Sequence, residues 1–174
     1  PHVKSMGEYL RDHAGLYDVV TLCRHYIAIQ HVDLLREHHP DTQIWFDTID
    51  LHYLRLRRQH ELDQAPATLK MAEVAHHEEC EVISKSDLTI VVSEVEVAEL
   101  ANEAPNAKVA VISNIHEVAR DRPAFDDRSG VMFVGGFQHP PNIVAVEYYA
   151  NEIWPLLTER CPDLETYIIG SRMP

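Results

Sequence analysis

The sequence has few cysteines, little positive charge and no long apolar segment. Its three cysteines, Cys23, Cys80 and Cys161, are odd in number and far apart, which favours a reduced, cytosolic setting over a disulfide framework. No apolar run approaches the roughly 18 residues that a transmembrane helix needs. The polar start "PHVKSMGEYLRDH" is not the pattern of a secretory signal peptide.

The charge balance is acidic, with 28 Asp and Glu residues against 15 Lys and Arg and a formal net charge of −13. A nucleic-acid-binding domain normally carries a basic face. Here the only short basic cluster is Arg55, Arg57 and Arg58, so no nucleic-acid partner is expected. Hydrophobic content of 45% indicates a globular chain rather than a disordered one.

Several motifs that would indicate an enzyme class are missing. There is no G-x-G-x-x-G fingerprint, which disfavours a dehydrogenase, and no G-x-S-x-G elbow, which disfavours a serine hydrolase. In "EVAHHEECE" (73–81), His76 and Cys80 stand one helical turn apart and could form the edge of a metal site. No second cluster of potential metal ligands is found elsewhere in the sequence. We therefore interpret this stretch as a solvated helix face and expect no metal.

Six short, continuous apolar runs are present, at 17–23, 43–46, 88–92, 109–112, 131–134 and 166–170. Such runs are typical of strands buried on both faces of a parallel sheet. Helix-length amphipathic stretches lie between most of them. This alternation predicts an α/β, doubly wound, Rossmann-like sheet with flanking helices.

The polar stretch 113–130 has no strand run and indicates a linker. We expect an N-terminal domain at 1–112 that lacks its start, a linker at 113–129, and a truncated second domain at 130–174. Forty-five residues form one βαβ unit, which is too little for an independent core. The exposed sheet edge and helix surface of such a fragment favour self-association.

The stretch "VMFVGGFQHPPN" places Gly135 and Gly136 between a predicted strand and a predicted helix. Glycines there let a ligand approach the backbone, and the helix N-terminus favours phosphate. Ligands of open α/β sheets bind at this edge. The alternative is a tight turn in which Pro141 or Asn142 starts the helix.

The stretch "IWFDTIDLHYLRLRR" gathers Asp47, Asp50, His52 and Arg55 after another predicted strand, where they could contact a substrate. The alternative is that Asp47 or Asp50 caps a long helix. In "TIVVSEVEVAEL", Ser93 is a good N-cap, and Glu96 would complete a capping box.

These blocks, together with "YDVVTLCRHYIA", "SDLTIVVSE" and "KVAVISN", resemble the large group 1 (family 4) of retaining glycosyltransferases with the GT-B fold. The resemblance runs from about Tyr17 to Gly170. It implies two Rossmann-like domains, the first on the acceptor side and the second on the side of the nucleotide-sugar donor. Asp50 and His52, then Asp47 and Arg55, would face the acceptor.

The resemblance further implies that Gly135, Gly136, Phe137 and Asn142 lie at the donor diphosphate. The family often has a basic residue in this loop, but Gln138 and His139 stand here. Its hallmark glutamate pair, with seven residues between, would lie beyond residue 174. Glu73 and Glu81 have this spacing, but in the first domain, so the catalytic residues stay unknown and the fragment alone is expected to be inactive.

The complete protein would be a hexosyltransferase-type enzyme of polysaccharide synthesis, acting with retention and without a metal or cofactor. Its acceptor would be a glycan or a lipid-linked sugar. It would be located in the cytoplasm, either free or at the inner face of the membrane. Two alternatives also stay open: a non-catalytic binding module and a GT-B sugar-nucleotide epimerase. Fold alone does not decide between them.

Overall fold

The computed structural model describes residues 5–118 and 120–173. The chain divides into two compact units, Pro1–His116 and Glu117–Pro174. Between the last strand of the first unit and the first strand of the second, the described residues are exposed. They form one short 3-10 turn, η1 (Phe125–Asp127).

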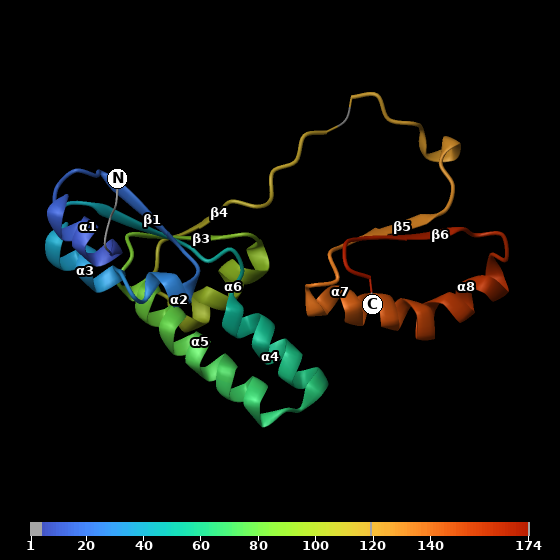
Figure 1. The fold of residues 1–174 in the computed structure, drawn as a ribbon, viewed down its shortest axis with the longest axis horizontal. Coiled ribbons are helices and arrows are strands. Elements are labelled where there is room, and N and C mark those ends of the chain that lie inside the picture. The colour runs from blue at the N-terminus through green and yellow to red at the C-terminus, as the bar shows by residue number, and fades with distance from the viewer. Residues whose placement is uncertain (1–4, 119, 174) are drawn as a thin grey trace. The chain divides into compact units, whose positions relative to one another are not determined.

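The described part of the first unit contains a four-stranded parallel sheet with the order β1-β2-β3-β4 (Figure 1). Its strands are β1 (Val19–Cys23), β2 (Gln43–Asp47), β3 (Leu88–Val91) and β4 (Val109–Val111). Three of them lie within the apolar runs that predicted them, and β2 extends one residue beyond its run, to Asp47. Within the described residues the order never reverses, so these four strands are wound in one direction.

Helices connect successive strands, as parallel pairing requires. Helix α1 (Met6–Asp12) precedes β1, and α2 (His25–Ala28) and α3 (Val32–His38) follow it. Helices α4 (His52–Asp63) and α5 (Pro66–Ser84) join β2 to β3, and α6 (Glu94–Glu103) joins β3 to β4. The helices gather on one face of the sheet (Figure 1).

One-sided cover explains which residues of β1 are buried, whereas in β3 the last three residues are all buried. In β1, Leu22 is 7% exposed, whereas Val19, Thr21 and Cys23 point to the other side and are exposed. The prediction of strands buried on both faces is therefore wrong for β1. A continuous apolar run does not by itself distinguish a strand covered on one face from one covered on both.

The core lies between the sheet and its helices. Side chains that are fully buried there include Phe46, Ile44, Leu35, Tyr53 and Leu100. Each such side chain contributes roughly 1.5–3 kcal/mol to the free energy of folding. This core fixes the positions from which α4, α5 and α6 reach the carboxyl edge of the sheet.

The second unit has the parallel strands β5 (Val131–Val134) and β6 (Thr166–Ile169), which lie where the sequence predicted them. Between them run α7 (Pro140–Tyr148), the π-helical segment η2 (Tyr149–Ile153) and α8 (Trp154–Arg160). Pro155 has no N–H to give to a helical bond, which accounts for the widened turn before it. Within the described residues, no helix combines the length and the apolar character needed to cross a membrane.

Candidate functional site

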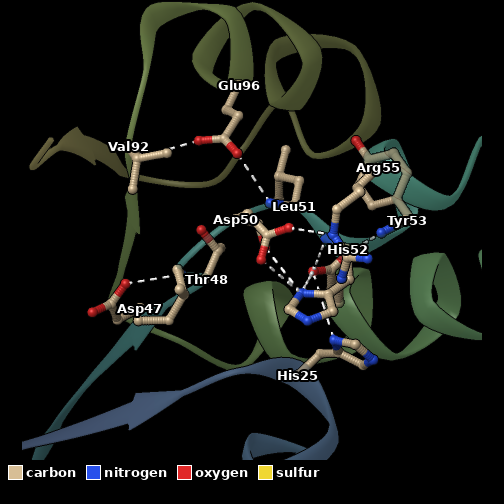
Figure 2. Close-up of polar contacts among 12 residues, drawn as sticks. His25, Asp47, Thr48, Asp50, Leu51, His52, Tyr53, Arg55, Val92 and Glu96 are labelled. Carbon is tan, nitrogen blue, oxygen red and sulfur yellow. Dashed lines mark hydrogen bonds and ion pairs between the residues drawn. The ribbon is translucent and has the colours of Figure 1, made fainter. Parts of the chain in front are cut away.

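Polar side chains of the first unit meet at the carboxyl edge of its sheet. His25 follows β1, the loop from Thr48 to Leu51 follows β2, and Ser93 follows β3. The carboxyl ends of parallel strands share one edge, and ligands of open α/β sheets bind there. Figure 2 shows His25, Thr48, Asp50 and Leu51 grouped around the start of α4.

Hydrogen bonds to the Asp47 side chain and to β3 stabilise the loop after β2. The hydroxyl of Thr48, which is fully buried, donates to the carbonyl of Ile90 over 3.0 Å. The N–H of Ile49 donates to the Asp47 carboxylate, also over 3.0 Å. Asp47, a predicted acceptor-side residue, is therefore engaged within its own loop.

Two residues at this edge have unusual backbone conformations. Arg24, after β1, has φ 67°, and Ile49, after β2, has φ 64°. A positive φ is strained for any L-residue and most of all for β-branched Ile. Strain of this kind gathers at ligand sites, where the surrounding structure fixes it. The N–H of Arg24 donates to the carbonyl of Asp47 over 3.0 Å, so the two strained turns are joined.

Helix α4 is capped by carboxylates from other helices. Its N-cap residue, Leu51, makes no side-chain cap of its own. Glu79 of α5 accepts hydrogen bonds from the N–H groups of His52 (2.9 Å) and Tyr53 (3.0 Å). Glu96 of α6 accepts from Leu51 over 3.0 Å. Neither Asp47 nor Asp50 caps the helix, contrary to the alternative drawn from the sequence.

Glu79 is fully buried, so the interpretation of 73–81 as a solvated face is wrong at this position. Because α4 begins in the core, its unpaired N–H groups need buried acceptors. A carboxylate fits this role, since the start of a helix attracts negative charge.

Three of the predicted acceptor-side residues lie together. Nε of Arg55 donates to Oδ2 of Asp50 over 2.7 Å, and Oδ1 of Asp50 lies 3.3 Å from Nδ1 of His52. Asp50 and Arg55 are partly exposed and His52 is buried. The group thus offers a carboxylate, a guanidinium and an imidazole to a ligand, and its acceptor role stays a prediction.

His25 and Glu79 complete the cluster. The sequence reasoning did not name His25, and it assigned Glu79 to a solvated helix face. The Nδ1 atoms of His25 and His52 lie 3.7 Å and 3.8 Å from Oε1 of Glu79. The imidazole rings of His25 and His52 have centroids 4.7 Å apart. Ligand atoms of these three residues all lie within 4.8 Å of one another, so the group could hold a metal ion. The expectation that no such cluster exists considered only residues near in sequence.

Burial governs the protonation of this cluster. Burial raises the pKa of Glu79 to about 7, against the opposing pull of the Tyr53 and His52 N–H groups. Burial, followed by the neighbouring His52, lowers the pKa of His25 to about 4. His25 is therefore neutral near pH 7, and its closeness to Glu79 is not an ion pair there.

A hollow opens beside the cluster between α2, α4 and α5. Its volume is about 590 Å³, and the two histidines line it together with Tyr26 and Arg55. The rest of its wall is mostly apolar: Leu56, Ala67, Lys70, Met71, Val74 and Ala75. A hollow of this kind suits a small ligand that has an apolar body and a polar end.

The predicted donor loop of the second unit is largely occupied by its own side chains. Nδ2 of Asn142 donates to the Gly136 carbonyl over 2.9 Å. A Cβ on Gly135 would lie 2.8 Å from that same Nδ2, so the missing side chain makes room for Asn142. Phe137 is 5% exposed. Gly136 is exposed and is the open position among the four predicted residues.

Helix α7 begins at Pro140, one residue before the earlier of the two predicted starts. Pro140 and Pro141 have no N–H, so the first turn presents fewer donors than an ordinary helix start. Among the described residues, the N–H groups of Gly136 and Gln138 have no protein acceptor. These two are the donors that the loop can offer to an anion.

Two other sequence predictions have clear outcomes. Ser93 is the N-cap of α6, and its side chain accepts from the N–H of Glu96. The predicted capping box is only half formed, because the Glu96 carboxylate accepts from Val92 over 2.9 Å instead. Its other oxygen accepts from Leu51, so it joins the starts of α6 and α4.

His76 and Cys80, the possible edge of a metal site on α5, contact each other, and His76 also contacts Glu103 of α6. Sγ of Cys80 lies 3.5 Å from Nε2 of His76, which lies 2.8 Å from a carboxylate oxygen of Glu103.

No family model matches the sequence, and no curated protein matches it significantly.

Proposed function

We propose that this chain is part of a glycosyltransferase with the GT-B fold. Its first unit would bind the acceptor and its second unit the nucleotide-sugar donor. The sequence resemblance suggests this division. The α/β architecture of the first unit, a parallel sheet consistent with a Rossmann-like fold, agrees with it.

The observation that carries the proposal is the meeting of Asp50, His52 and Arg55 at the carboxyl edge of the sheet. A sugar hydroxyl both donates and accepts hydrogen bonds. Asp50 would accept from such a hydroxyl, and Arg55 would donate to a neighbouring oxygen. His52 and Arg55 also line the hollow, which would receive the less polar part of the acceptor.

The donor would lie against the loop after β5. Transfer breaks the bond between the sugar and the diphosphate, and negative charge grows on the leaving oxygen. The free N–H groups of Gly136 and Gln138 would stabilise that charge. Bare backbone at Gly136 would let the diphosphate approach closely.

Amide NMR of the isotopically labelled chain tests both halves of this proposal. UDP-glucose and GDP-mannose serve as donor probes, and a panel of methyl glycosides serves as acceptor probes. A donor should shift the amides of Gly136 and Gln138 and leave Gly15 unchanged. A matching glycoside should shift the amides from Asp50 to Tyr53.

The substitution Asp50→Asn separates the two sites. It should abolish the response to glycoside and leave the response to nucleotide sugar intact. The matched control is Asp41→Asn, at an exposed position outside the site. Absence of any donor response at millimolar concentration would overturn the placement of the donor at the loop after β5 and would favour a binding module.

A further inference from the structure

We propose that His25, His52 and Glu79 form a binding site for a divalent transition-metal ion of the zinc type. The three residues come from the starts of α2 and α4 and from the middle of α5. Each is less than a tenth exposed, and their ligand atoms lie within 4.8 Å of one another. Two imidazoles and one carboxylate are a ligand set that suits zinc and related ions.

The first supporting observation is an unsatisfied buried nitrogen. Among the described residues, Nδ1 of His25 has no hydrogen-bond partner, and the residue is 8% exposed. Leaving such a group buried and unpaired is unfavourable, because it loses its hydrogen bond to water and gains none in return. The nearest complementary atom is Oε1 of Glu79 at 3.7 Å, which is too far for a hydrogen bond. A metal ion between the two atoms would satisfy both.

The second observation is the spacing. Ligand atoms about 2.0–2.1 Å from a tetrahedral ion lie roughly 3.3–3.4 Å from one another. The distances from Oε1 of Glu79 to the two Nδ1 atoms, 3.7 Å and 3.8 Å, exceed this only slightly. Small side-chain rotations would close the difference, and the rotation of His52 would also move Nδ1 away from the Asp50 carbonyl, which lies 3.1 Å from it.

The third observation is that the carboxylate is already oriented. Backbone N–H groups of His52 and Tyr53 each hold one oxygen of Glu79. Hydrogen bonds of this type to a ligating group fix its direction and are a regular feature of metal sites. Oε1 accepts one hydrogen bond and keeps a lone pair for an ion.

The fourth observation is access. His25 and His52 both line the hollow between α2, α4 and α5, which gives an ion an entry path. Asp50 lies 3.3 Å from His52 and forms an ion pair with Arg55, which also lines the hollow. Three protein ligands leave a position for water or a ligand oxygen, which is the arrangement of catalytic rather than structural zinc sites. This proposal does not depend on the proposed transferase function, because that resemblance implies no metal.

Titration with Co²⁺, followed by visible absorption, tests the site in the whole chain. The chain has other histidines, and the pair His76–Cys80 is the main competitor. The experiment therefore uses a Cys80→Ser background, in which any thiolate-to-cobalt band from this pair disappears. We expect one Co²⁺ ion to bind per chain, with the visible absorption bands of a four- or five-coordinate ion. Added Zn²⁺ should displace the Co²⁺ and remove these bands.

His25→Ala carries the test, because Nδ1 of His25 makes no hydrogen bond whose loss could disturb the fold. It should weaken Co²⁺ binding by at least about 100-fold. The matched control is His77→Ala, an exposed histidine on α5, which should leave binding unchanged. Glu79→Gln should also weaken binding, and circular dichroism should show whether α4 survives it.

Two results would overturn the proposal. One is the absence of one-to-one Co²⁺ binding in the Cys80→Ser chain. The other is equal affinity in the His25→Ala and His77→Ala chains. Neither result bears on the transferase proposal, which is tested by nucleotide-sugar binding instead.

Discussion

Oε2 of Glu79, in the middle of α5, accepts a hydrogen bond from the N–H of Tyr53 in the first turn of α4. The residues are 26 positions apart, and both are fully buried. The other oxygen of the carboxylate accepts a hydrogen bond from the N–H of His52. A single side chain thus supplies two of the acceptors that the start of α4 needs.

We therefore predict that Glu79→Ala destabilises the first unit by about 3 kcal/mol, because two buried N–H groups lose their acceptor. Urea unfolding followed by Trp45 fluorescence measures the change, in a Trp154→Phe background so that only the first unit reports. Glu78→Ala, on the same helix but partly exposed, should cost much less. Similar losses in the two variants would contradict the capping role.

The positive φ of Ile49 predicts a reversed order of stability between two substitutions. Glycine adopts this conformation without strain, so Ile49→Gly should be more stable than Ile49→Ala by about 1 kcal/mol. Ile27, similarly exposed but helical, is the control, and there the alanine variant should be the more stable by about 1 kcal/mol. Urea midpoints of the four variants give both differences. The same order at both positions would refute strain at Ile49.

Asp87 should make the first unit sensitive to acid. Burial alone would raise the pKa of this carboxyl, but hydrogen bonds from the Ile44 N–H and from Arg36 outweigh it and hold the pKa below its usual value. A carboxyl whose pKa falls on folding stabilises the protein above its unfolded pKa. That stabilisation is lost as the pH drops through the folded pKa.

Asp87→Asn should accordingly cost about 1 kcal/mol above about pH 5, after allowance for solvent screening of this partly exposed group. The difference from the wild type should shrink toward zero as the pH falls through the lowered pKa of Asp87. Urea unfolding at a series of pH values measures it, with the exposed Asp41→Asn as control. A difference that stays constant with pH would rule out the proposed linkage.

The second unit should depend on Gly170 more than on any glycine of its loop. A Cβ at Gly170 would lie 1.9 Å from the carbonyl oxygen of Gly135, whereas a Cβ at Gly136 meets only Ser171 Oγ, at 3.6 Å. Gly170→Ala should destabilise this unit by about 3 kcal/mol or more, and Gly136→Ala by less than about 1 kcal/mol. Trp154 fluorescence in a Trp45→Phe background reports the unfolding. Equal effects would show that the two backbone segments do not approach this closely.

The strands could be predicted because their signal is local. Each of the six apolar runs coincides with a strand that the structure shows, although β2 extends one residue beyond its run. The start of α6 was also predictable, since Ser93 caps its own helix. What the runs could not show was the one-sided cover of the sheet, because cover depends on where distant helices pack.

The site was predictable only in part, for the same physical reason. Asp50, His52 and Arg55 are close in sequence and were found together. His25 and Glu79 come from other elements, and only tertiary packing joins them. One signal for Glu79 did exist: it shares the buried face of α5 with Ala72, Ala75, Val82 and Ile83, at helical spacing.

The order of the strands has a consequence for how the first unit is built during synthesis. Each strand of the four-stranded sheet pairs with the strand that directly precedes it along the chain. No strand has to be inserted between two that are already paired. The sheet can therefore grow from β1 to β4 in the order in which a ribosome delivers it, each crossover closing before the next strand emerges.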